Sequence, residues 1–478
     1  MFFRKHTGGT LVWRRLKCRL SRPGSGDSWY YLFVYLGDRG VEESALKSRA
    51  IKVAALILAA LFTVAGCTSH ADTTVVPEEE APLYTWGEFT GRTITVWGDK
   101  DDLSRPYIVR AFEDYQQKTG NVIEVVPLSK VDLDEKVPRA FSSDEEERPD
   151  LLLSYGGTNV ENLNPDENFY DFTDAPWIDD LTDTALTQAV FNGKVIGLPH
   201  GEASVSGTLY NKELFETYHL DIPTTQEEFL SVCETLLQNG VTPVYLPYKE
   251  ITMLLYQFPM DSFLKEQRVL DGLNDNTLSY ADVPEMRKIV QWYKTMSDSG
   301  YFGEAYADND WDGMDEAMQS GEYAMMLCWD TWLYTGYTGD PSNIGIMPAF
   351  MGTPENGSFE GPNILLGIAN KKSDQLDVTL DLINFMADPC NYNVHYAGVY
   401  TAPVFNDQRG SITTPQYMET ERLINKLFYN STAWSRVRGF SQIDASYIQQ
   451  YMQDELSLES CLQAMNDARL SRLGLQEP

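Results

Sequence analysis

Strand and helix patterns alternate along residues 92–155, and few folds accommodate that order. Alternating β-branched residues predict strands, and apolar residues at helical spacing predict helices. We expect strands at 92–97, 121–128 and 150–155, with helices at 107–118 and 130–141. A β-α-β-α-β order predicts an α/β fold, in which helices cover both faces of a doubly wound parallel sheet.

Ligands of such sheets bind beyond the carboxyl ends of the strands. The first strand is followed by a predicted loop at 98–102, and the third is followed by two glycines. The candidate ligand-binding residues at this edge are therefore Asp99, Lys100, Tyr155 and Gly156. A solvated turn is the alternative for Asp99 and Lys100.

Residues 192–215 are rich in small side chains and lead into a second set of helices, so we interpret them as a crossing between two lobes. Tyr210 and Asn211 are expected to pack and cap at the end of this crossing. Thr225 and Glu228 form a predicted capping box. Further helices are expected at 226–237, 252–263, 284–297, 312–320, 376–387, 414–429, 446–456 and 458–473, and further strands at 241–245, 323–328, 344–347 and 364–368.

The formal net charge is −33, and a chain this acidic is repelled by nucleic acid and by anionic lipid heads. We therefore expect no nucleic-acid partner. The six cysteines form no CxxC pair, so neither a zinc site nor a redox motif is predicted. Cys233 and Cys461 lie among apolar neighbours, which favours buried free thiols.

Motifs of common enzyme classes are absent. The sequence has no GxSxG, HExxH, GxGxxG or phosphate-binding loop, and its five histidines are scattered. No catalytic residue and no cofactor are predicted. The many carboxylates leave a glycosidase pair open.

Residues 1–66 are interpreted as a signal or leader region. Lys47, Arg49 and Lys52 precede an uncharged apolar run at 53–66, which is typical of a secretory signal and short for a membrane span. Residues 64–67 resemble the bacterial lipobox, which implies that Cys67 is acylated; an ordinary signal with an incidental cysteine is the alternative. Residues 1–45 fit no signal peptide, and our hypothesis is that they are a gene-start artefact. The acidic stretch 67–84 is interpreted as a tether.

The sequence from GKVIGLP at 193–199 through LYNKELFETYHLDIPTTQEEFLSVCETL at 209–237 resembles the extracellular solute-binding proteins of ABC importers, in the branch that includes maltose-binding protein. SGEYAMMLCWDTW, GIMPAF and GIANKKSDQLDVTLDLINFM extend the resemblance across most of 92–473. It implies two α/β lobes, formed by 85–203 with 367–412 and by 207–361 with 413–478. Hinge crossings would fall near 203–206, 361–366 and 401–412, with the ligand between the lobes.

The resemblance also implies ligand-binding roles for particular residues. Asp99 and Lys100 match an acidic residue and a lysine that hold sugar hydroxyls in maltose-binding protein, and the aromatic platform matches either Trp329 or Trp332. Glu202 lies near an acidic hinge residue of that relative. Aromatic faces stack on sugar rings and charged groups bind hydroxyls, which adds these candidates in the second lobe: Tyr248, Arg438, Trp434 and Tyr447.

The leading hypothesis is a lipid-anchored receptor on the outer face of the cytoplasmic membrane. It would bind a carbohydrate as a monomer and deliver it to an ABC permease. A secreted hydrolase acting on glycans and a receptor for a non-sugar solute are the alternatives.

Residues 308–313 (DNDWDG) look like the start of a calcium-binding loop. Position twelve is Gln319, where a bidentate glutamate is expected. We favour the interpretation that this segment caps a helix at 312–320 and supplies its acidic first turn.

Overall fold

The computed structural model describes residues 14–20, 28–34, 82–142, 147–201, 205–250, 264, 266–361, 364–429 and 436–475. The chain divides into two compact units, Met1–Glu79 and Glu80–Pro478. The described part of the first unit is an antiparallel hairpin of β1 (Arg14–Leu20) and β2 (Ser28–Val34). Everything below concerns the second unit.

The first sheet of the second unit has the strand order β4-β3-β5-β14-β8. Strands β3, β4 and β5 run parallel, as predicted, whereas β14 pairs antiparallel with β5 and β8. The five strands are β3 (Thr93–Asp99), β4 (Val122–Leu128), β5 (Leu151–Tyr155), β8 (Leu198–His200) and β14 (Leu365–Ala369). The two-stranded ribbon β6 (Val190–Phe191) and β7 (Lys194–Val195) completes this region.

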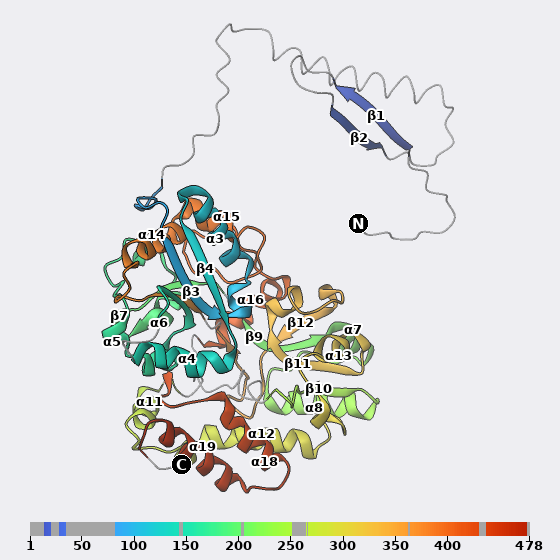
Figure 1. Cartoon of the computed structure of the whole chain (residues 1–478). Coiled ribbons are helices and arrows are strands. Elements are labelled where there is room, and N and C mark those ends of the chain that lie inside the picture. The colour runs from blue at the N-terminus through green and yellow to red at the C-terminus, as the bar shows by residue number, and fades with distance from the viewer. Residues whose placement is uncertain are drawn as a thin grey trace, which may run out of the picture. The chain divides into compact units, whose positions relative to one another are not determined.

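Helices enclose the first sheet. Proline at the first helical position starts α3, and Gly120 ends it in the left-handed conformation with φ 74°. Figure 1 shows α3, α14 and α15 gathered beside β3 and β4. The helices are α2 (Lys100–Leu103), α3 (Pro106–Thr119), α4 (Lys130–Ser142), η1 (Gly157–Leu163), α5 (Pro165–Asn168), η2 (Ile178–Asp180), α6 (Asp183–Ala189), α14 (Leu376–Ala387) and α15 (Pro389–His395).

The segment 98–102 was predicted to be a loop, and this prediction was wrong. Gly98 and Asp99 continue β3, and Lys100–Leu103 forms the short helix α2. Asp99 caps that helix, because its carboxylate accepts a hydrogen bond from the Asp101 amide at 2.8 Å.

The second sheet has the strand order β10-β11-β9-β13-β15, and β12 also pairs with β9. Only the β10–β11 and β13–β15 pairs are parallel among the described strands of this sheet. The strands are β9 (Ser206–Asn211), β10 (Thr242–Tyr245), β11 (Tyr323–Trp329), β12 (Ile344–Met347), β13 (Phe359–Glu360) and β15 (Phe428–Tyr429).

Most helices around the second sheet lie close to their predicted bounds. Figure 1 shows α12, α18 and α19 packed together. The helices are α7 (Lys212–Thr217), α8 (Gln226–Gln238), α11 (Gln267–Asn274), η3 (Tyr280–Asp282), α12 (Pro284–Asp298), η4 (Tyr306–Asp308), α13 (Met314–Ser320), η5 (Asp330–Tyr334), η6 (Pro341–Asn343), α16 (Pro415–Leu427), η7 (Gln442–Asp444), α18 (Ala445–Met452) and α19 (Leu458–Arg472). The helix predicted at 252–263 lies outside the described residues.

Helix caps account for several of these boundaries. Asn211 caps α7, as predicted, by accepting from the amides of Glu213 and Leu214. Thr225 caps α8 by accepting from the Glu228 amide at 3.2 Å. The Glu228 carboxylate accepts from the backbone amide of Thr224, at 2.7 Å, rather than from that of Thr225. The Thr225 half of the predicted capping box is therefore confirmed, whereas the Glu228 carboxylate binds the amide one residue earlier than predicted.

Each sheet has its own apolar core. One cluster of buried side chains comes from the first sheet and its helices, between Tyr84 and Leu198 and between Ile364 and Phe405. Two other clusters come from the second sheet and its helices. Cys233 and Cys461 are buried free thiols, as predicted. No helix among the described residues combines the length and apolarity needed to cross a membrane.

The chain passes between the two sheets after β8, between β13 and β14, and again before α16. The buried carboxylate of Asp330 joins two of these passages. Its Oδ1 accepts from the Val205 amide at 3.1 Å, and its Oδ2 accepts from the hydroxyl of Thr414. Thr414 also caps α16, so the second-sheet ends of both passages are held by one side chain.

The start of the second unit is docked on the helices of the first sheet. The Leu83 and Tyr84 amides donate to Asp388 Oδ2 at 2.7 and 3.0 Å, and the ring of Trp86 meets that of Phe385 edge-on at 4.8 Å. Asp388 is fully buried and also caps α15 through its other oxygen.

Candidate ligand-binding site

The carboxyl edge of β3 and β5 brings four predicted residues together. The two strands are parallel neighbours, with Trp97 opposite Leu152, so Asp99 and Tyr155 end them at the same sheet edge. Lys100 is exposed, and Gly156 is buried. A Cβ on Gly156 would lie 2.5 Å from the Gln188 carbonyl oxygen, so only glycine fits there.

A charged group behind Tyr155 was missed by the sequence reasoning. Arg105 donates from Nη2 to Asp102 Oδ1 at 2.7 Å, and the Tyr155 hydroxyl donates to the same oxygen at 3.1 Å. Burial raises the pKa of the Asp102 carboxyl, and the Arg105 guanidinium opposes that shift. This network orients the phenol ring of Tyr155. In the sequence, the sign of this pair was an aspartate, Asp102, followed three residues later by an arginine, Arg105. This spacing brings two side chains together on a helical turn.

The two candidate platform tryptophans lie in different environments. Trp332 is only 4% exposed and belongs to the core of the second sheet, with its ring 5.5 Å from that of Tyr337. Trp329 is half-buried and ends β11. Its ring stacks on that of Trp311, with centroids 5.4 Å apart and planes inclined by 23°. Trp329 is therefore the one of the two with surface to offer a ligand.

Tyr248 and Tyr447 contribute mainly to the second core. Tyr248 is 6% exposed, and its hydroxyl accepts from Gln453 Nε2 at 2.6 Å. Tyr447 is half-buried against the same core. Among the described residues, no contact links either tyrosine to the β3–β5 edge.

Arg438 forms an ion pair with Glu161, which lies in η1 beside the first sheet. Its Nε donates to Glu161 Oε1, in η1, at 2.6 Å, and its backbone amide donates to Asn274 Oδ1. Both charged side chains line a cavity of about 630 Å³ that begins just after Gly156. The other lining residues are Gly157, Thr158, Asn164, Pro165, Asp166, Glu167, Val190, Phe191, Asn192 and Arg436. The lining includes charged and amide side chains that can hydrogen-bond to a polar solute.

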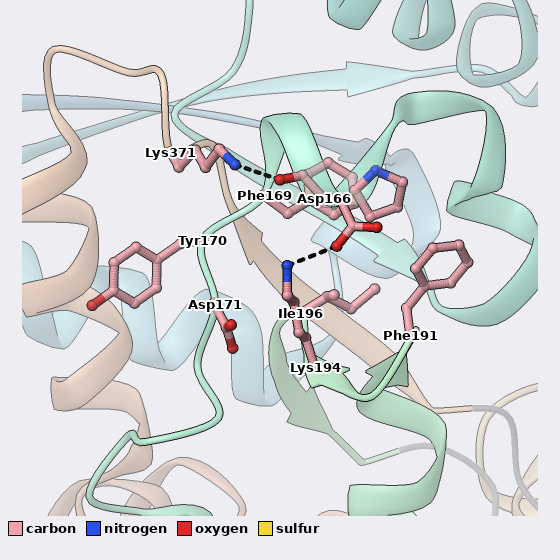
Figure 2. Close-up of a pocket in the computed structure, with 9 residues that line it drawn as sticks. Asp166, Phe169, Tyr170, Asp171, Phe191, Lys194, Ile196 and Lys371 are labelled. Carbon is pink, nitrogen blue, oxygen red and sulfur yellow. Dashed lines mark hydrogen bonds and ion pairs between the residues drawn. The ribbon is translucent and has the colours of Figure 1, made fainter.

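A smaller cavity of about 100 Å³ lies among residues of the first sheet. Figure 2 shows the Lys194 ammonium directed at the Asp166 carboxylate, 2.7 Å away, and Lys371 directed at the Asp166 backbone oxygen. Its charged groups thus bind one another, and its volume is too small for a sugar ring. The larger cavity is the better candidate for ligand binding.

Three predicted residues, Cys67, Glu202 and Trp434, lie outside the described residues, as does most of the leader and tether. The segment 308–313 is described. Its helix α13 begins at Met314 rather than at residue 312, and Asp310 accepts from the Gly313 amide at 3.0 Å. No group of three or more His, Cys, Asp or Glu side chains suited to a metal ion occurs in the described part of the chain.

Comparison with known proteins places these features in context. The sequence profile described as "Bacterial extracellular solute-binding protein" matches residues 110–409. An uncharacterized ABC transporter extracellular-binding protein of Pyrococcus horikoshii is 22% identical over 309 residues, which cover 62% of this chain and 70% of that protein.

Solved structures show the same fold. A putative binding protein, MsmE of Bacillus subtilis, in an open conformation, superposes with a TM-score of 0.67 at 15% identity and covers 80% of this chain and 98% of its own. A sugar transporter protein of Bacillus licheniformis in complex with stachyose superposes with a TM-score of 0.61 at 16% identity, over 80% of this chain and all of its own. The mixed α/β fold is thus shared with solved binding proteins, which confirms the predicted fold class.

Proposed function

The chain belongs to the family of bacterial extracellular solute-binding proteins, and on this premise we propose that it captures a carbohydrate between two lobes and delivers it to an ABC importer. The family consists of binding proteins, so the chain is a receptor rather than a glycan hydrolase. The bound solute and the mode of delivery are the proposed part.

The two lobes are proposed to be 85–203 with 367–412 and 207–361 with 413–478. The separate apolar clusters around the two sheets support this division. The Asp330 carboxylate bonds to Val205, within the proposed crossing at 203–206, and to Thr414, two residues after the proposed crossing at 401–412, and these bonds support the proposed hinge. Rotation about such a hinge would open and close the space between the lobes.

The observation that carries the carbohydrate proposal is that a half-buried tryptophan ends a strand of the second sheet, while polar residues end two strands of the first sheet. Trp329 ends β11 of the second sheet, while Asp99 and Tyr155 end strands of the first. Sugar rings present apolar C–H faces to aromatic rings and hydroxyls to charged or amide groups. A sugar transporter protein that binds stachyose shares the fold.

Membrane attachment and partners form the rest of the proposal. Acylation of Cys67 would hold the receptor on the outer face of the cytoplasmic membrane. Of the predicted tether 67–84, Leu83 and Tyr84 are docked on Asp388, so the proposed tether ends before them. A permease partner is supported by the name of the Pyrococcus relative, an ABC transporter extracellular-binding protein. We expect the receptor to act as a monomer.

The test is a thermal-shift screen with stachyose and with malto-, xylo- and chito-oligosaccharides. A ligand that binds only the folded state raises the melting temperature, by an amount that corresponds to about 2.7 kcal/mol at one hundred times Kd. A rise with at least one sugar is expected. A screen in which peptides or polyols raise the melting temperature and no sugar does would overturn the carbohydrate assignment.

Variants of the two tryptophans localise the site. Trp329→Ala is expected to weaken sugar binding, and so to reduce the sugar-induced rise, while the protein stays folded. Trp332→Ala is expected to lower the free energy of unfolding by about 3–5 kcal/mol, because it empties a core position. Sugar binding by a folded Trp329→Ala variant with unchanged affinity would place the platform elsewhere.

A further inference from the structure

The tryptophan of the DNDWDG segment, Trp311, stacks on Trp329, the proposed platform residue. Trp311 and Trp329 are both half-buried, and their rings stack with centroids 5.4 Å apart. The sequence predicted that this segment caps the following helix and supplies its acidic first turn, and that prediction was wrong: Gly313 is the N-cap of α13 without a side-chain bond, and the acidic first turn is Asp315 and Glu316. The stacked pair gives the segment a different role.

Hydrogen bonds fix this segment where it leaves the core of the second sheet. The Tyr245 hydroxyl donates to the Asp310 carbonyl oxygen at 2.9 Å, and the Asp310 carboxylate accepts from the Gly313 amide at 3.0 Å. Gly313 packs so closely that a Cβ there would lie 2.5 Å from the Tyr245 hydroxyl. Trp311 is therefore held between two fixed residues.

Strand pairing brings this segment to the edge that carries Trp329. Strands β10 and β11 are parallel, with Tyr245 opposite Met326, so both end at the same side of the sheet. Tyr245, the last residue of β10, holds the segment, and Trp329 is the last residue of β11. The carboxyl ends of such strands are where α/β proteins bind their ligands.

We propose that Trp311 is a positioning residue, which fixes the indole ring of Trp329 in one orientation before a sugar binds. This inference rests on the proposed function and concerns the same site. An unsupported indole on a strand end would lose rotational freedom on binding, and that loss would weaken the affinity. A stacked neighbour removes the freedom in advance. Stacked aromatic pairs of this kind correspond to about a two- to tenfold change in an equilibrium constant.

The first measurement needs no ligand. Two stacked indoles couple their electronic transitions, and the coupling produces a paired positive and negative band in circular dichroism. Trp311→Phe and Trp329→Phe should each remove the same pair of bands. Trp86→Phe is the matched control, because Trp86 is also half-buried in an aromatic contact but lies on the first sheet's helices; its spectrum should keep the bands.

The second measurement is calorimetric titration with stachyose, or with the oligosaccharide of the screen that raises the melting temperature most. Trp311→Ala should raise Kd about two- to tenfold, with Trp311→Phe restoring part of the affinity. The double variant Trp311→Ala/Trp329→Ala should bind no more weakly than Trp329→Ala alone, because the first residue acts through the second.

The outcomes separate this inference from the proposed function. If the wild-type protein binds sugar and Trp311→Ala binds it equally well, the positioning role is overturned and the receptor function stands. The same holds if the losses from the two alanine substitutions add. If the wild-type protein binds no sugar, the proposed function fails and the inference fails with it.

Discussion

His200 is the last residue of β8 and lies immediately before the first passage between the sheets. Its ring is buried and stacks near that of Tyr107, with centroids 6.3 Å apart. Burial lowers the pKa of His200 to about 3, and the nearby Arg105 charge contributes in the same direction. The side chain is therefore neutral in the folded protein over the range in which a free histidine titrates.

This histidine predicts a dependence of stability on pH. The unfolded chain binds a proton at His200 near pH 6.5, whereas the folded chain does so only near pH 3. Stability from this group is therefore complete above pH 6.5 and decreases as the pH falls toward 3, by up to about 1.4 kcal/mol per pH unit. His200→Gln should remove this component, so the difference between variant and wild type should shrink as the pH falls from 7 to 4.

Urea denaturation at a series of pH values measures the effect. His395, whose pKa burial also lowers, is present in both proteins, so its contribution cancels. His219→Gln, at an exposed position, is the control and should follow the wild-type profile. A stability difference between His200→Gln and wild type that stays constant over this range would contradict the prediction.

At the same scale, the sequence could name residue types for the site but could not choose among them. Trp329 is the last residue of β11, and Trp332 lies three residues later. Only the turn at η5 decides that the second is buried. The stacking of Trp311 on Trp329 could not be predicted either, because it depends on strands β10 and β11 becoming neighbours.

Among the elements, α15 depends on Asp388 for more than its first turn. One carboxylate oxygen accepts from the Cys390 amide at 3.0 Å and caps the helix, while the other accepts from the Leu83 and Tyr84 amides. Asp388→Ala would remove the cap and leave the buried Tyr84 amide without this acceptor. We expect the free energy of unfolding to fall by about 2–4 kcal/mol.

Urea denaturation of Asp388→Ala beside Asp340→Ala checks this expectation. Asp340 also caps a helix, accepting from the Ser342 amide at 3.0 Å and from the Ser342 hydroxyl, but it is exposed and both bonds lie within its own turn. Asp340→Ala should lower the free energy of unfolding by about 0.5–1 kcal/mol. Equal losses from the two variants would show that the contact with Leu83 and Tyr84 adds nothing.

Element positions followed from the sequence wherever periodicity was regular. The helix at 376–387 and the strand at 344–347 were predicted with their observed bounds. The short helix α2 was missed because four polar-rich residues after a strand look like a turn. The antiparallel direction of β14 could not be predicted, since it depends on where a distant passage returns to the first sheet.

Across the whole second unit, the ion pair between Glu161 and Arg438 joins residues of the two proposed lobes. The two side chains are 29% and 52% exposed, so the pair is worth at most about 1 kcal/mol. That energy corresponds to about a fivefold change in the ratio of closed to open molecules. Glu161→Gln or Arg438→Gln should therefore increase the mean separation of the lobes in the ligand-free protein.

Small-angle X-ray scattering at low and high salt tests this effect. The radius of gyration of the variants should exceed that of the wild type at 0.05 M salt, and 1 M salt should reduce the difference because it screens exposed charges. Arg287→Gln is the matched control, since its pair with Glu459 has the same 2.6 Å distance but lies within the second-sheet region. Identical scattering from all four proteins would exclude a role for the pair in lobe separation.

The docked segment at 83–88 has a mechanical consequence. Tension applied to the chain before it would be transmitted through the Leu83 and Tyr84 amides to Asp388, and through the Glu88 amide to Asp381, on helices α15 and α14. In the proposed two-lobe arrangement, this load path ends in the first lobe and bypasses both the hinge and the cavity. Drag on a tethered receptor would then load only the first lobe and would not separate the two lobes. The affinity for the solute would therefore be independent of flow past the cell.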